Sequence, residues 1–208
     1  MLRRMGLGPK GDRMGRLIHQ GIRIMMYSRQ IAVSVVERNV TIASRRSSGI
    51  VVGGGPAIVR NNVSAGNGES GIRLQNYGKR GLLRGVVIAN NTVYNNDEGG
   101  ISTSEIGVQD AILVNNAAHG RSGAPALPPP RSGVRLVGNV DCSLSLCFTN
   151  PDALNFSPFL GSALLGAGVI GVGNGIPRED LFGVLRRIPP TVGAIDRPSG
   201  PILLTPKP

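Results

Sequence analysis

The sequence is poor in aromatic residues: it has no tryptophan, three tyrosines and four phenylalanines, or 3% of 208 residues. The core must therefore be built from Val, Ile, Leu and Ala, within a hydrophobic fraction of 40%. Proteins that bind single-stranded nucleic acid interleave aromatic side chains with cations so that the bases can stack. We therefore expect no nucleic-acid partner.

Acidic residues and histidines are also scarce. The chain has 12 Asp and Glu against 23 Lys and Arg, a formal net charge of +11, which favours anionic partners. His19 and His119 have no cysteine or second histidine at ligand spacing, so we predict no metal site of the zinc type. His119 precedes a proline-rich stretch and is interpreted as a solvated loop residue.

No run of about 18 apolar residues occurs, so no membrane span is predicted. The basic residues 1–16 lack the apolar run and the small-residue cleavage site of a secretory signal peptide. Two interpretations of this beginning stay open: an atypical or truncated start, and a genuine basic tail.

Cysteine is too rare to define a disulfide framework. Cys142 and Cys147 are five residues apart, and either a local disulfide or two buried thiols would account for them. Glycine and proline, in contrast, are abundant: the chain contains 31 Gly and 15 Pro, and both residues disfavour long helices.

A short run of β-branched residues that ends in asparagine recurs five times. The copies are residues 35–40, 58–63, 87–93, 112–117 and 135–140, and the last asparagine of each is at 39, 62, 91, 116 or 139. Gly-Ile pairs at 21–22, 49–50, 71–72 and 100–101 keep step with this repeat. The spacing of 23 to 29 residues lies in the range of solenoid proteins.

This pattern predicts two or three short strands per repeat, separated by polar corners. Asparagine tolerates the left-handed conformation of a sharp corner, and stacked asparagines hydrogen-bond amide to amide. Stacked coils would bury every inward Ile, Val and Leu in one column, so we predict a parallel β-helix. The alternative is an antiparallel meander with Asn-Asn turns.

The pattern I/V-x-x-N-N-x-V followed by a Gly-Ile strand resembles the right-handed parallel β-helix repeat proteins of the pectate-lyase-like superfamily, over about Gly21 to Asp141. Residues 154–161 and 192–196 are similar to the closing segment of many secreted bacterial β-helix proteins. The resemblance implies an all-β solenoid of about five coils and an extracellular or cell-surface location.

The composition divides the chain into three parts. Residues 1–20 form an atypical basic segment, residues 21–150 contain the repeats, and residues 151–208 form an irregular C-terminal segment expected to cap the last coil. A proline-rich loop at 120–131 is expected to project between the fourth and fifth coils. One short helix is predicted from Arg178 to Leu185.

Polysaccharide cleavage requires two carboxylates or a base, often with Ca²⁺. The compact acidic group Asp97, Glu98 and Glu105, with Asp110 nearby, supplies the candidate catalytic residues. The candidate substrate-binding residues are Arg73, Lys79, Arg80, Arg84, Tyr77 and Tyr94. We expect no cofactor, with Ca²⁺ at these acids as the alternative, and ordinary solvated charges would give the same pattern.

Two hypotheses of function follow. The first is an extracellular β-helix that binds, or acts on, an acidic polysaccharide; an enzyme of this kind would be a polysaccharide lyase or a glycoside hydrolase. The second is a structural or surface-interaction solenoid without catalysis, which the scarcity of acids, aromatics and histidines favours. The sequence does not predict the oligomeric state.

Overall fold

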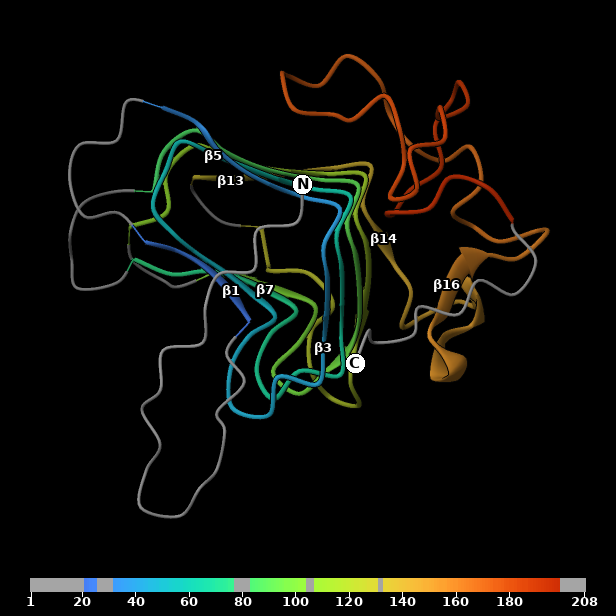
Figure 1. Cartoon of the computed structure of the whole chain (residues 1–208), viewed down its shortest axis with the longest axis horizontal. Helices are drawn as coiled ribbons and strands as arrows, with labels where there is room; N and C mark the ends of the chain where they lie inside the picture. Colours follow the sequence, from blue (N-terminus) through green and yellow to red (C-terminus); the bar gives the residue numbers. More distant parts are fainter. Residues whose placement is uncertain (1–20, 26–31, 77–82, 104–106, 131–132, 199–208) are drawn as a thin grey trace.

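The computed structural model describes residues 21–25, 32–76, 83–103, 107–130 and 133–198. In this part of the chain, short strands follow one another around three-sided coils, and Figure 1 looks along the stack of coils. Among the described residues, the helical structure is one 3₁₀ turn, η2 (Pro151–Ala153). No helix in the described ranges is long and apolar enough to cross a membrane.

The coils contribute their strands to three parallel sheets. Sheet A contains β1 (Ile22–Met25), β4 (Ile50–Gly53), β7 (Ile72–Leu74) and β10 (Ile101–Thr103). Sheet B contains β2 (Ser34–Glu37), β5 (Ala57–Arg60), β8 (Val86–Ala89), β11 (Ala111–Val114) and β13 (Val134–Val137). Sheet C contains β3 (Val40–Ile42), β6 (Val63–Ala65), β9 (Thr92–Asn96), β12 (Ala117–Gly120) and β14 (Val140–Asp141).

The register of the sheets follows the sequence repeat. The isoleucines of the four Gly-Ile pairs lie opposite one another in sheet A, in the order Ile22, Ile50, Ile72 and Ile101. Because these strand pairs are parallel, the antiparallel meander is excluded. Four coils contribute to all three sheets and a fifth contributes to sheets B and C, so the predicted all-β solenoid of about five coils is confirmed as a class.

At the corner between sheets B and C, two neighbouring residues have different roles. The first residue of each pair takes a positive φ, between 50° and 61°: Arg38, Asn61, Asn90, Asn115 and Gly138. The second residue is the asparagine that recurs in the sequence. The left-handed turn therefore belongs to the residue before the repeat asparagine, and residues with a low cost for positive φ occupy four of the five positions.

The repeat asparagines form the predicted ladder. The side-chain oxygen of Asn91 accepts from the backbone N–H and the side-chain amide of Asn62, at 3.0 and 2.9 Å. Asn91 in turn donates both groups to Asn116 at 2.9 Å. The same pattern begins at Asn39 and ends at Asn139. Each buried amide is thus satisfied by the coils on either side.

A second ladder, which the sequence reading missed, lies at the corner between sheets C and A. The Asn67 side chain accepts from the Ser44 backbone N–H at 3.0 Å, and Asn67 donates to the Asn96 side chain at 2.8 Å. Asn67 and Asn96 are 29 residues apart, as are Asn62 and Asn91. That shared spacing was the available signal.

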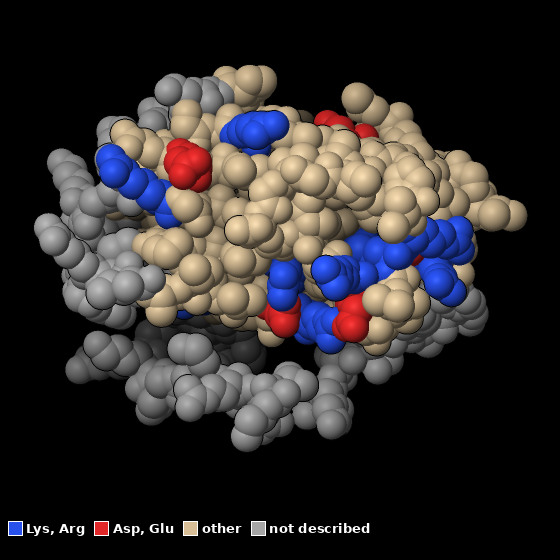
Figure 2. Space-filling model, turned by 90° about the horizontal axis from the view of Figure 1, so that it is seen from above, with Lys and Arg blue, Asp and Glu red and all other residues tan. Residues whose placement is uncertain are grey.

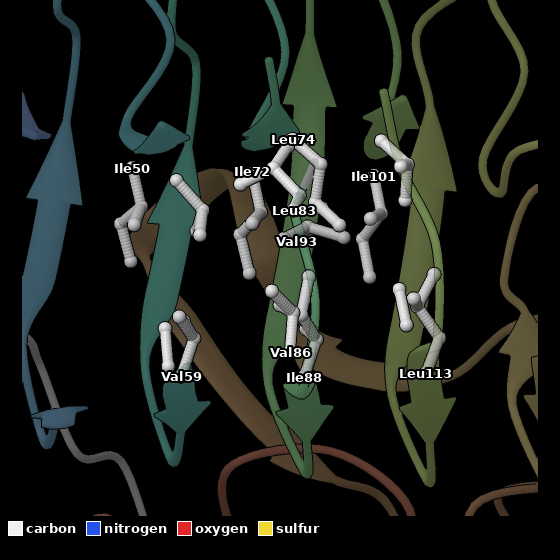
Figure 3. Close-up of a cluster of buried hydrophobic side chains, with 14 of the residues drawn as sticks. Ile50, Val59, Ile72, Leu74, Leu83, Val86, Ile88, Val93, Ile101 and Leu113 are labelled. Carbon is white, nitrogen blue, oxygen red and sulfur yellow. The ribbon is translucent and has the colours of Figure 1, made fainter. Parts of the chain in front are cut away.

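The core is a column of stacked aliphatic side chains. Figure 3 shows Ile50, Ile72 and Ile101 in line from sheet A, and a second line of Val59, Ile88 and Leu113 from sheet B. All six side chains are buried. Burial of one Ile or Leu side chain contributes roughly 1.5–3 kcal/mol, so each coil stabilises its neighbours without aromatic residues.

The proline-rich stretch does not project from the solenoid as predicted. The N–H of Ile101 donates to the carbonyl oxygen of Ala126 at 2.9 Å, and Ala126 is 3% exposed and lies in the core. This stretch therefore takes the place of a sheet A strand in the fifth coil. Proline has no N–H to donate to a ladder, so Pro125 and residues 128–130 prevent a regular strand.

The C-terminal segment, residues 151–198, runs along the side of the coils instead of over the last coil. Side-chain amides of three successive coils donate to its carbonyl oxygens: Asn61 to Glu179, Asn90 to Thr191 and Asn115 to Val169, at 2.7, 3.2 and 2.9 Å. In Figure 1 the orange and red segment lies beside the corner between sheets B and C. Left-handed corner residues expose amides there, and this segment satisfies them.

The expected boundary at residue 150 falls inside an antiparallel hairpin. Strand β15 (Phe148–Asn150) pairs with β16 (Asn155–Pro158) around the turn η2. Cys142 and Cys147 form a disulfide, with their Cα atoms 5.7 Å apart, which decides between the two alternatives for these residues. The repeats therefore end at β14, and the disulfide connects that strand to the hairpin.

The helix predicted at residues 178–185 is wrong. The Asp180 carboxylate accepts from the N–H groups of Phe182 and Val184 at 2.9 and 3.0 Å, and Gly183 has a φ of 83°. Glu179 and Leu185 form an antiparallel bridge across this turn. An aspartate that caps local N–H groups competes with helix formation, which explains the difference.

A buried arginine binds the C-terminal segment to the coils. Arg186 donates to the side-chain oxygen of Asn61 at 2.7 Å and to the carbonyl oxygens of Thr191 and Gly193 at 3.1 and 2.9 Å. Its side chain is 3% exposed, and it lies 3.7 Å from the fully buried Asp196. Burial lowers the pKa of Arg186 to about 10, against the opposing effect of Asp196 and Asp180, so Arg186 is a cation at neutral pH.

Candidate functional site

Charged side chains follow the outer side of the corner between sheets C and A. We call this set the charged ridge; its members are Arg45, Arg46, Glu69, Arg73, Asp97, Glu98 and Arg121. The turns that carry it are stacked: the N–H of Gly68 donates to the Ser44 carbonyl and the N–H of Glu98 to the Glu69 carbonyl, at 2.8 and 3.2 Å. Residues far apart in sequence are thereby neighbours along the solenoid axis.

Arg73 holds two carboxylates from neighbouring coils. Its Nη1 lies 3.2 Å from Oε2 of Glu69 and 3.1 Å from Oε2 of Glu98. Arg73 points outward from β7, while the two glutamates come from the turns before β7 and β10. Their side chains are 29%, 32% and 54% exposed, in the order Arg73, Glu69 and Glu98, so the cluster is open to solvent. Glu69 also accepts a hydrogen bond from the Ser48 hydroxyl at 3.0 Å.

Asp97 forms an ion pair with Arg121 of the next coil. Arg45 and Arg46, in the first coil, are exposed and form no ion pair with another described residue. The predicted acids Asp97 and Glu98 therefore do lie near the predicted cation Arg73, but each acid is bound to an arginine. Two partners, Glu69 and Arg121, were not identified from the sequence, because nothing local marks a contact across coils.

The remaining predicted site residues are not brought to this cluster by the described structure. Arg84 precedes β8 and donates to the Gln109 side chain at 3.1 Å, at the corner between sheets A and B. Asp110 lies beside Gln109, before β11. Tyr77, Lys79, Arg80 and Glu105 lie outside the described residues.

Tyr94 belongs to an aromatic cluster on the outer face of sheet C. Its ring centroid lies 4.5 Å from that of His119, 5.9 Å from Phe148 and 5.6 Å from Phe156. Burial, and then Asp152, raise the pKa of Tyr94. Tyr94, one of the candidate substrate-binding residues, thus packs between the solenoid and hairpin β15–β16.

His119 is not the solvated loop residue that we expected. It lies in β12, its ring stacks on Tyr94, and its Nδ1 is buried without a hydrogen-bond partner among the described residues. Burial lowers the pKa of His119, although Asp141 and the backbone act in the opposite direction. The imidazole is therefore neutral at pH 7 and serves as a packing group.

Within the described ranges, no group of three or more His, Cys, Asp or Glu side chains is placed so that it could hold a metal ion. Asp97 and Glu98 are occupied by arginines. Glu105 lies outside the described residues, so Ca²⁺ binding at these acids stays an untested hypothesis.

The excess of positive charge is distributed unevenly. The described residues contain thirteen arginines and ten acids, an excess of three, whereas the whole chain has +11. Figure 2 shows a largely uncharged face with arginines gathered along one side and a few acids among them. Most of the net positive charge that the sequence indicates therefore belongs to residues outside the described ranges.

The sequence of residues 19–147, more than half of the chain, matches the family described as right handed beta helix region. The chain belongs to the right-handed β-helix family. No curated protein and no solved structure matches it. The match ends at Cys147, so the β-helix family accounts for the coils and the disulfide, and it leaves out hairpin β15–β16 and the C-terminal segment. The predicted resemblance to pectate-lyase-like proteins is consistent with this membership.

Proposed function

We propose that this β-helix is an extracellular protein that binds an acidic polysaccharide along the charged ridge. The observation that carries the proposal is the exposed cluster of Arg73 with Glu69 and Glu98, flanked by further charges on the coils before and after it. Neighbouring parallel strands are about 4.8 Å apart. An extended polymer that lies across the coils meets a charged group at each step.

The chemistry of the ridge suits a polymer that carries both hydroxyl and carboxylate groups. The acids accept hydrogen bonds from hydroxyls, and guanidinium groups donate in pairs to carboxylates. Arg45 and Arg46 are the arginines of the ridge that form no ion pair with a described acid, so they are the contacts we assign to uronate carboxylates. With four arginines and three acids, the ridge is weakly basic.

Binding, without cleavage, is the activity that this geometry favours. Glu69 Oε2 and Glu98 Oε2 are at most about 6.3 Å apart, the sum of their distances of 3.2 and 3.1 Å to Arg73 Nη1. Glycosidases place two carboxylates at a comparable separation, about 5–9.5 Å, but the scissile bond lies between them. Here Arg73 occupies that space.

A structural solenoid without a glycan ligand is the second candidate. It is favoured by the intrachain ion pairs, which engage Arg73 and Arg121 together with Glu69, Asp97 and Glu98. Exposed pairs of this kind contribute about 0–1 kcal/mol each, so they tie coils together weakly.

A glycan array that contains polygalacturonate and neutral glucans, combined with a test for unsaturated uronate release, separates the candidates. We expect binding to polygalacturonate that weakens as salt is added, because exposed charges are screened over about 8–10 Å. We expect no product release. The variant Arg45→Gln/Arg46→Gln should bind at least tenfold more weakly, and Arg135→Gln, an exposed arginine on β13, should bind normally.

Binding that ignores salt, or that falls equally in Arg45→Gln/Arg46→Gln and Arg135→Gln, removes the ridge as the site. Absence of binding to every glycan leaves the structural solenoid. Release of unsaturated uronate that Glu69→Gln or Glu98→Gln abolishes would show catalysis at the ridge and overturn a binding function.

A further inference from the structure

The C-terminal segment carries a surface where exposed arginines alternate with exposed apolar side chains. We call it the arginine–aliphatic surface; its members are Arg178, Phe182, Leu185, Arg187, Ile188 and Arg197. Ile188 is 85% exposed and Leu185 is 65% exposed, which is unusual for such large apolar side chains. Neither the ridge nor the β-helix family match extends to these residues.

The backbone beneath this surface is held in place. The N–H of Arg186 donates to the Arg178 carbonyl at 2.9 Å, and the N–H of Arg187 donates to the Asp196 carboxylate at 3.1 Å. Arg178, Arg187 and Arg197 therefore extend from adjoining stretches of chain. Because Arg186 points inward to Asp196, its neighbours Leu185 and Arg187 point outward. The surface is built by the fold and does not require induced order.

The three arginines of this surface are available to a ligand. Arg178, Arg187 and Arg197 are exposed and form no ion pair with a described residue. Other nearby charges are neutralised, since Arg38 pairs with Glu179. The positive charge of the surface is thus unopposed, and an anionic partner is required to complement it.

We propose that the arginine–aliphatic surface binds an anionic lipid membrane. Guanidinium groups bind phosphate oxygens in pairs, and basic side chains near an anionic bilayer each strengthen binding. Ile188, Leu185 and Phe182 would enter the boundary between headgroups and acyl chains, as the apolar side of an interfacial segment does. A soluble polyanion would leave these side chains in water. The proposal is independent of glycan binding at the ridge.

The full chain offers a direct probe, because it contains no tryptophan. In the variant Ile188→Trp, the single indole should shift its emission to shorter wavelength on vesicles of phosphatidylglycerol and phosphatidylcholine, and not on phosphatidylcholine alone. In Leu144→Trp, where the tryptophan is placed at an equally exposed position in the disulfide loop, emission should not change. The opposite result, or no shift in either variant, overturns the proposal.

Co-sedimentation with the same vesicles tests the arginines and the apolar side chains of the surface separately. Each arginine is expected to strengthen vesicle binding about fivefold, so the variant Arg178→Gln/Arg187→Gln/Arg197→Gln should bind roughly a hundredfold more weakly. The variant Leu185→Ser/Ile188→Ser should lose about tenfold or more on vesicles and nothing on soluble polygalacturonate. Controls are Arg45→Gln/Arg46→Gln/Arg135→Gln and Leu144→Ser/Leu160→Ser, which alter exposed residues elsewhere.

A loss in the arginine variant with none in Leu185→Ser/Ile188→Ser identifies a site for soluble polyanions and overturns the lipid proposal. Equal losses in the control variants overturn it as well. If Leu185→Ser/Ile188→Ser abolishes self-association in size exclusion and leaves vesicle binding intact, the surface joins two copies of the chain, and the lipid proposal fails. Melting temperatures of all variants show whether each is folded.

Discussion

At the scale of single residues, two adjacent positions do different work at the same corner. Asn90 turns the chain with a positive φ, and Asn91 joins the coils through its amide. The pair appears in the sequence as one motif, and its two roles become distinct only in three dimensions. Substitutions at the two positions should therefore fail for different reasons.

Replacing Asn91 with Val should lower the free energy of unfolding by about 3 kcal/mol, because it leaves buried groups of Asn62, Asn116 and the backbone without partners. Urea unfolding measures this. Asn39→Val, at the half-buried end of the ladder, is the matched control and should cost roughly 1 kcal/mol. Equal costs at both positions would contradict the ladder's role in stability.

Acidification should destabilise the protein through His119. Burial lowers the folded-state pKa of His119 below the usual 6.5, so above pH 6.5 both states are neutral there and the group has no effect. As the pH falls through 6.5, the unfolded state takes up the proton first and stability is lost. Melting temperatures measured between about pH 7.5 and 5.5 should therefore fall less steeply in His119→Gln than in the native chain. Parallel slopes would refute this assignment.

At the scale of elements, the C-terminal segment behaves as a lateral support. It spans the second to the fourth coil through the amides of Asn61, Asn90 and Asn115. Arg186 is its central anchor, since it contacts both the coil and three carbonyl oxygens of the segment's own last turns. Strands of three to five residues gain stiffness from such support.

Replacing Arg186 with Met should destabilise the protein by about 4 kcal/mol, because Asp196 is left buried without its cation. Hydrogen exchange should show lost protection of the amides in residues 178–196 before the coils open. Arg187→Met changes the exposed neighbour and should stay within about 0.5 kcal/mol of the native chain. If the two variants were equally stable, the anchor role of Arg186 would be disproved.

At the scale of the whole molecule, solenoid and C-terminal segment share one hydrophobic cluster. Val63 and Ala117 on the outer face of sheet C pack with Val192 and Ala194. The sheet therefore has apolar side chains on both faces, one toward the core column and one toward the C-terminal segment. Repeat proteins often gain stability coil by coil, but here a single segment crosses several coils.

A chain that ends after Cys147 should therefore aggregate. Its repeats are complete, but Val63, Ala65 and Ala117 lose their cover and become an exposed apolar patch. Size exclusion and circular dichroism compare it with the full chain. A monomer with the native β spectrum and a cooperative melt near that of the full chain would show that the coils are an independent domain.

Much of the fold was predictable from periodicity. Asn62, Asn91 and Asn116 recur at the phase that the coil requires, and the Gly-Ile pairs mark the strands of sheet A. Such repeats can be recognised because each coil makes the same contact with the next coil, so the same residue types recur once per coil. The site was less readable, since Arg73 was identified but its partner Glu69 was not.

The parallel solenoid, its aliphatic core and its ladder of repeat asparagines could be predicted from the sequence, because each depends on a local pattern that repeats, whereas the sequence left two or three strands per coil open. The position of the C-terminal segment, the pairing of charges across coils and the burial of Ala126 in the core became known from the folded structure. These contacts occur once and join residues as far apart as Asn61 and Glu179, separated by 118 positions. A contact that occurs only once produces no periodic pattern in the sequence, so it can be recognised only in the folded chain.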